Sequence, residues 1–152
     1  MPRSRRLLCA VYAATALLAL VGTWSQNVAY VRPGDGALTG FVQATARFWP
    51  ETLATPAATS ITVDIGLFFF AAALLMLLEA RRLEIRFAWL YVIGGLLIAI
   101  SVTFPLFLIA RERRLAARGQ GGGEPGLSTG DVVGLALLGV ASVVFTLWTI
   151  GR

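Results

Sequence analysis

The chain has 152 residues, of which 57% are hydrophobic and only 14% are charged. About a quarter of the residues of an ordinary soluble domain are charged, so this composition predicts an integral membrane protein built from helices. The net charge of +5 comes from arginines that flank the apolar stretches, as membrane topology requires. We therefore expect membrane lipids around the chain and no nucleic acid as a partner.

The residue types exclude several kinds of functional site. The sequence contains one cysteine, Cys9, and no histidine, which excludes an intrachain disulfide and a histidine-based metal site or triad. It also lacks a nucleotide-binding loop and a nucleophile motif. We therefore expect no catalytic residue, no metal and no cofactor, and the sequence favours a protein that is not an enzyme.

The first predicted element is a transmembrane helix from about Leu7 to Asn27. The arginines before it resemble the start of a signal peptide. However, the apolar run is too long for one and offers no cleavage site of small residues. We expect this segment to be retained as a signal anchor that ends at the turn residues Arg32 and Pro33.

Residues 38–49 form the second predicted element, a short amphipathic helix that Pro50 should end. Twelve residues cannot cross a bilayer, so we expect this helix to lie at the membrane interface or to re-enter the membrane. Its apolar face consists of Leu38, Phe41, Val42, Thr45, Phe48 and Trp49.

A second transmembrane helix should begin at Thr55 and Pro56 and run to about Ala80. Threonine is a favourable N-cap, and proline is tolerated at the first helical position. This start places Asp64 two turns inside the helix, about 12 Å along its axis. A carboxylate within a membrane span costs roughly 2.5–3.5 kcal/mol, so Asp64 needs either a partner or a function.

A charged hinge follows the second span and contains Glu79, Arg81, Arg82 and Arg86. These residues are typical of a solvated turn with local ion pairs, and the alternative is that they belong to a functional site.

The third predicted span runs from about Phe87 to Ala110, with a kink at Pro105 because proline lacks the N–H that a helix needs. Residues 1–118 are thus expected to form a three-span core. A glycine-rich linker at 119–130 then leads to a fourth transmembrane helix at 131–152. The predicted fold is an all-α bundle of about four spans with one interfacial helix.

With four membrane crossings, the distribution of arginines favours neither membrane orientation strongly. Seven would lie on the N-terminal side and six on the other side. We expect a cytoplasmic N-terminus, because the first span usually dominates. The six on the other side would be Arg32, Arg47, Arg111, Arg113, Arg114 and Arg118.

Polar residues of the first three spans are expected at a similar depth, away from the N-terminus. One interpretation is that Asp64 hydrogen-bonds to its neighbours and holds the spans together. The alternatives are a protonatable site or ligand anchor, or a side chain that reaches the interface. The candidate polar layer comprises Gln26, Asn27, Ser60, Asp64, Ser101 and Thr103.

Five sequence pieces occur in order along the first three spans: Gly22-Thr23-Trp24, Ser60-Ile61-Thr62-Val63-Asp64, Glu79-Ala80-Arg81-Arg82-Leu83, Trp89-Leu90-Tyr91-Val92 and Phe104-Pro105-Leu106-Phe107-Leu108. Together they make the chain similar to a family of small bacterial membrane proteins, domain of unknown function 2834. The resemblance covers about two thirds of the chain and leaves out the linker and the fourth span. That family has no established activity, so the resemblance implies the fold and the membrane location.

Three functional hypotheses follow from the sequence. The first is a non-enzymatic accessory, assembly or structural component of the bacterial inner membrane, acting as a homo-oligomer or within a larger complex. The second is a small proton-coupled transporter that uses Asp64. The third is a lipid- or isoprenoid-modifying enzyme with Asp64 as its acid, which would need further positioned polar groups.

Overall fold

The computed structural model describes residues 3–34, 36–119 and 127–150, and these parts contain helices and no strand. Four helical segments are long and apolar enough to cross a membrane. This finding confirms the expected all-α fold of a multi-pass membrane protein. In chain order the elements are α1 (Arg3–Asn27), η1 (Val28–Tyr30), α2 (Ala37–Glu51), α3 (Pro56–Leu83), α4 (Ala88–Gly94), η2 (Gly95–Ala99), α5 (Ile100–Ala117) and α6 (Thr129–Ile150).

Helix α3 begins where its sequence predicts. The hydroxyl oxygen of Thr55 accepts a hydrogen bond from the backbone N–H of Ala58 at 3.1 Å, and Pro56 is the first helical residue. The helix ends at Leu83, and Glu84 caps it in a left-handed backbone conformation with φ of 54°. Phe87 has φ of 59°, so the short connection to α4 turns sharply.

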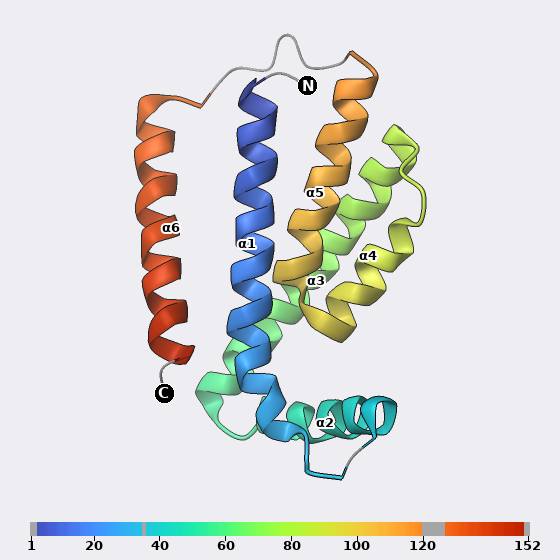
Figure 1. Ribbon diagram of the computed structural model, residues 1–152, viewed down its shortest axis with the longest axis vertical. Helices are drawn as coiled ribbons and strands as arrows, with labels where there is room; N and C mark the ends of the chain where they lie inside the picture. The colour runs from blue at the N-terminus through green and yellow to red at the C-terminus, as the bar shows by residue number, and fades with distance from the viewer. Residues whose placement is uncertain (1–2, 35, 120–126, 151–152) are drawn as a thin grey trace.

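The third long segment, residues 88–117, folds back on itself instead of crossing the bundle (Figure 1). The chain reverses at Ala99, whose extended backbone has φ of 179° and ψ of 141°. The rings of Tyr91 and Phe107 therefore meet edge to face, with centroids 5.6 Å apart. A straight helix would separate these residues by about 24 Å. The segment expected to cross from Phe87 to Ala110 is thus bent back on itself, and the reversal precedes Pro105 by six residues.

Two glycines allow the arms of this hairpin to approach closely. A Cβ atom on Gly94 would lie 3.1 Å from Cγ2 of Thr103. One on Gly95 would lie 2.9 Å from a ring carbon of Phe69 and 3.0 Å from Oγ1 of Thr103. Their missing side chains make room for α3 and α5 against η2, which explains how a segment without a loop can reverse.

The hairpin begins and ends at the same end of the bundle as the N-terminus of α1. Its first arm, Ala88–Ala99, spans at most about 18 Å, whereas the hydrocarbon core is about 30 Å thick. At its return, Arg118 donates a hydrogen bond of 2.9 Å to the carbonyl of Arg82 at the end of α3. We call this end of the bundle the arginine end.

The core lies between α3, α4 and α5. Met76 and Phe107 are fully buried, and Ala73, Ala80 and Val92 surround them. The alanines let α3 approach the hairpin closely, while α5 packs on its other side along α1 (Figure 1).

Helix α2 lies across the end opposite the arginine end (Figure 1). Aromatic contacts attach it to α1 and η1: Trp24 stacks on Phe41 with centroids 6.0 Å apart, and Tyr30 meets Phe48 edge to face. The expected helix at 38–49 is therefore present, although Pro50 lies inside its last turn and the helix ends at Glu51. Helix ends are commonly displaced by one or two residues.

Helix α6 runs parallel to α1 and contains no buried residue (Figure 1). It approaches α1 at Gly22, where a Cβ atom would lie 2.7 Å from Cγ2 of Thr146. Near the end of both helices, the side chain of Gln26 donates a hydrogen bond of 3.1 Å to the carbonyl of Thr149. The end of α6 thus lies opposite the arginine end.

Candidate functional site

The arginine end contains a network of ion pairs that joins α1, α3 and α5. Arg5 of α1 lies 3.3 Å from Glu112 of α5, and both side chains are less than 10% exposed. Glu112 also contacts Arg111 at 2.9 Å. Arg111 in turn lies 2.9 Å from Glu79 of α3, which also pairs with Arg82 at 3.2 Å. Five charged side chains therefore link the three helices.

Burial decides which contacts in this network matter for stability. Exposed pairs contribute at most about 1 kcal/mol, whereas removing one member of a buried pair costs about 3–5 kcal/mol. Arg5 and Glu112 are buried, so their contact fixes the start of α1 against α5. A second, exposed pair joins Arg118 and Glu84 at 3.1 Å.

The structure divides the predicted hinge into two parts. Glu79 and Arg82 belong to the network, whereas Arg81 and Arg86 are exposed and make no ion pair within the described part of the chain. Sequence reasoning missed the roles of Arg5 and Glu112. Their separation of 107 residues leaves no local signal, and only the reversal at Ala99 places them at the same end.

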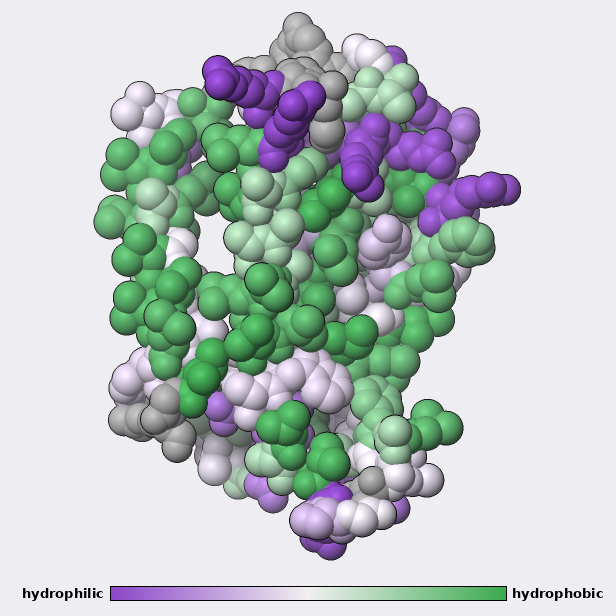
Figure 2. All heavy atoms as spheres, in the orientation of Figure 1, coloured by the Kyte–Doolittle hydropathy of each residue, from purple (hydrophilic) through white to green (hydrophobic). Residues whose placement is uncertain are grey.

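The hairpin also redistributes the positive charge. Arg111, Arg113, Arg114 and Arg118 lie at the arginine end, whereas the tally for four crossings assigned them to the other side. Figure 2 shows the most hydrophilic side chains gathered at this end of the molecule. Of the twelve described arginines, two lie towards the opposite end, Arg32 and Arg47, and the other ten are Arg3, Arg5, Arg6, Arg81, Arg82, Arg86, Arg111, Arg113, Arg114 and Arg118.

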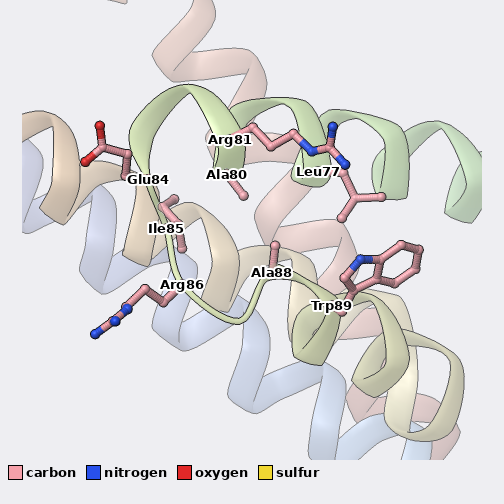
Figure 3. A pocket seen from close by; sticks show the side chains of 8 residues that line it. All are labelled: Leu77, Ala80, Arg81, Glu84, Ile85, Arg86, Ala88 and Trp89. Carbon is pink, nitrogen blue, oxygen red and sulfur yellow. The ribbon is translucent and has the colours of Figure 1, made fainter.

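Two open hollows flank the connection between α3 and α4. The first has a volume of about 360 Å³ and lies between the end of α3 and the start of α4. Arg81 and Trp89 lie on one side of it, and Glu84 and Arg86 point towards the other side (Figure 3). The second hollow, of about 580 Å³, lies between α4 and α5. Within the described residues, no group of three His, Cys, Asp or Glu side chains could hold a metal ion.

Asp64 lies on a part of α3 that other helices do not cover. It is exposed, and it makes no hydrogen bond or ion pair with any residue that the structure describes. From Ser60 to Phe68 every residue except Thr62 is exposed. One turn after Asp64, Phe68 meets Phe104 near the hairpin tip, with ring centroids 6.4 Å apart. In the single chain Asp64 thus makes none of the hydrogen bonds through which it was expected to hold the spans together.

None of the other members of the predicted polar layer makes a hydrogen bond to Asp64 within the described residues. Gln26 bonds to α6, and Asn27 ends α1. Ser101 is exposed near the hairpin tip, while Thr103 is buried against Gly95. Ser60, the sixth candidate, is exposed one turn before Asp64 on α3. Within the described ranges, no hydrogen bond joins any two of the six candidate residues. The physical reason is the reversal at Ala99, which replaces a crossing helix by a tip.

One comparison with known proteins gives a match. A family model described as "Protein of unknown function DUF2834" matches residues 11–113, from α1 almost to the end of α5. The matched range thus includes the hairpin and ends before α6, as the resemblance in the sequence implied. No curated protein and no solved structure matches the chain.

Proposed function

The chain belongs to the family described as "Protein of unknown function DUF2834", and we propose that it is a non-catalytic component of a larger assembly in the bacterial inner membrane. The observation that carries this proposal is Asp64, an exposed carboxylate on a largely apolar part of α3 that makes no hydrogen bond or ion pair with any residue that the structure describes. A partner protein or a second copy would cover this part of α3 and satisfy the carboxylate.

The depth of Asp64 supports the proposal. Glu79 belongs to the ion-pair network, and we place one boundary of the hydrocarbon core at this network because charged side chains are costly inside the core. Asp64 precedes Glu79 by fifteen residues, or about 22 Å along α3. The core is about 30 Å thick, so Asp64 lies inside it on the opposite side. The distance along α1 from Arg5 to Gln26, about 31 Å, gives the same thickness.

The cost of this position also supports a partner. A carboxylate within the hydrocarbon costs roughly 2.5–3.5 kcal/mol, and such residues usually face other helices. The neighbouring exposed side chains are large and apolar, among them Ile61, Ile65, Leu67 and Phe68. A hydrogen-bond donor on a neighbouring helix would remove part of the cost, as polar groups between membrane helices do.

A crosslinking experiment tests this contact surface. We expect a photoreactive amino acid at Leu67, which is 67% exposed, to crosslink to a protein partner in intact membranes. The matched control is Leu137 of α6, which is 68% exposed and should give lipid adducts only. The Asp64→Leu variant should abolish the crosslink at Leu67. An uncrosslinked chain, or equal crosslinks at both positions, would contradict the proposal.

The same carboxylate favours one second candidate, proton-linked transport. Asp64 is exposed within an apolar span and makes no ion pair with a residue that the structure describes, and such residues often belong to ion or proton pathways. The transport hypothesis expects Asp64→Asn to fold normally and to lose proton movement in reconstituted vesicles, measured with an internal pH dye. Unchanged proton movement would reject it. The enzyme hypothesis has no such support, because no described polar group contacts Asp64.

The arginine distribution supports a cytoplasmic N-terminus. Basic residues next to membrane spans remain on the cytoplasmic side. With the hairpin returning to the arginine end, ten of the twelve described arginines lie with the N-terminus. If residues 88–117 crossed the membrane instead, the arginines would be divided almost equally between its two sides.

A further inference from the structure

The hollow between α4 and α5 combines two exposed arginines with an apolar floor. Its volume is about 580 Å³, within the range of about 300–1,000 Å³ that is common for ligand sites. Arg113 and Arg114 line it together with the apolar side chains of Ile85, Leu106 and Ile109 and the ring of Tyr91. The hollow is open at the surface, so a molecule from outside the protein can enter it.

The charge of these two arginines is not neutralised by the protein. Neither Arg113 nor Arg114 makes a hydrogen bond or an ion pair with a residue that the structure describes. The three acidic residues nearby are Glu79, Glu84 and Glu112, and all of them are paired with other arginines. The hollow therefore has a local excess of positive charge that an anion would balance.

Along α5, the arginines and the apolar side chains of the hollow occur in the same order as the headgroup and the acyl chains of a phospholipid in a bilayer. Arg113 directly follows Glu112, which belongs to the network of ion pairs at the arginine end. Leu106 lies two turns earlier on α5, about 10 Å deeper in the membrane. A phosphate at the level of the arginines would thus have an acyl chain beside Leu106 and Ile109.

We propose that this hollow binds an anionic phospholipid from the leaflet at the arginine end. The guanidinium groups of Arg113 and Arg114 donate hydrogen bonds to the phosphate, a geometry that the planar group of arginine suits. Basic pockets between membrane helices bind anionic headgroups in this way. The hollow beside Arg81 is less suited, because Glu84 also lines it.

The chain offers a matched control for the arginines. Arg81 and Arg86 are also exposed, unpaired within the described ranges and located at the arginine end, but they line the other hollow. The variants R113Q/R114Q and R81Q/R86Q therefore remove the same charge from the same end. Neither pair of side chains makes a hydrogen bond or an ion pair with a described residue, so both variants should unfold at the temperature of the wild type, which is measured first.

The test is native mass spectrometry of the full chain in mild detergent, titrated with phosphatidylglycerol or phosphatidylcholine. We expect the wild type to bind one phosphatidylglycerol in preference to phosphatidylcholine. R113Q/R114Q should weaken this binding by about 25-fold, since each arginine contributes about a factor of five. R81Q/R86Q should bind as the wild type does. Equal weakening in both variants would overturn the proposal, as would a wild type without preference.

A second arm separates a lipid from free phosphate and probes the apolar floor. Inorganic phosphate at millimolar concentration should not displace phosphatidylglycerol, because it lacks the acyl chain. The variant Leu106→Gln should weaken lipid binding although both arginines remain. Displacement by phosphate, or unchanged binding in Leu106→Gln, would show an anion site without a lipid-specific part and would overturn the proposal.

Discussion

The carboxylate of Glu112 is 4% exposed and has Arg5, itself 7% exposed, as its partner from α1. The variant Glu112→Ala leaves that guanidinium buried without its counter-charge. We expect the free energy of unfolding to fall by about 3–5 kcal/mol. The measurement is an unfolding titration in mixed detergent, followed by tryptophan fluorescence.

Glu84→Ala is the control for this residue. The side chain of Glu84 is 80% exposed and pairs with Arg118, so its loss should cost less than about 1 kcal/mol. The double variant Arg5→Met with Glu112→Met should be more stable than Glu112→Ala, because no unpaired charge stays buried at position 5. Equal effects of Glu112→Ala and Glu84→Ala would contradict the importance of the buried pair.

At the scale of elements, the hairpin of α4, η2 and α5 makes a direct prediction. Gly94 and Thr103 lie side by side, since a Cβ atom on Gly94 would be 3.1 Å from Cγ2 of Thr103. In a straight helix they would be about 13 Å apart, beyond the reach of a disulfide. In a Cys9→Ala background, Gly94→Cys with Thr103→Cys should therefore form an intramolecular disulfide.

The disulfide is measured in membranes treated with a hydrophobic oxidant, by mass spectrometry after alkylation of free thiols. A control pair, Gly94→Cys with Gly66→Cys, should remain reduced, because nothing lies within 4 Å of a Cβ atom on Gly66. Free thiols in the first pair would contradict the hairpin.

The elements that the sequence foresees are those with local signals. Thr55 and Pro56 mark the start of α3, and the amphipathic pattern of residues 38–49 marks α2. The reversal at Ala99 has only a weak local signal, because Gly94 and Gly95 precede it without a proline or a polar turn cluster, and Pro105 points to a kink further along. It results from tertiary packing at Gly94 and Gly95. The polar layer was predicted around Asp64 on the assumption that a crossing helix carries Ser101 and Thr103, and the hairpin differs from that assumption.

At the scale of the whole molecule, the hairpin and the arginines together predict one membrane topology. Three helices, α1, α3 and α6, cross, with the N-terminus in the cytoplasm and the end of α6 outside. Ala37 and Ala117 are both exposed, and they lie at opposite ends of the bundle. In a Cys9→Ala background, we expect a membrane-impermeant maleimide on intact cells to label Ala37→Cys and to leave Ala117→Cys unlabelled until the membrane is opened.

This pair of positions separates the alternatives, because each topology gives its own labelling pattern. A third segment that crossed the membrane would place both cysteines outside, so both would be labelled on intact cells. An inverted protein would give label at Ala117→Cys alone. The expected pattern follows from the positive-inside rule once the hairpin has placed ten arginines at one end. The reversal at Ala99 thereby fixes the position of residues 111–118, and with them the strongest determinant of orientation in the chain.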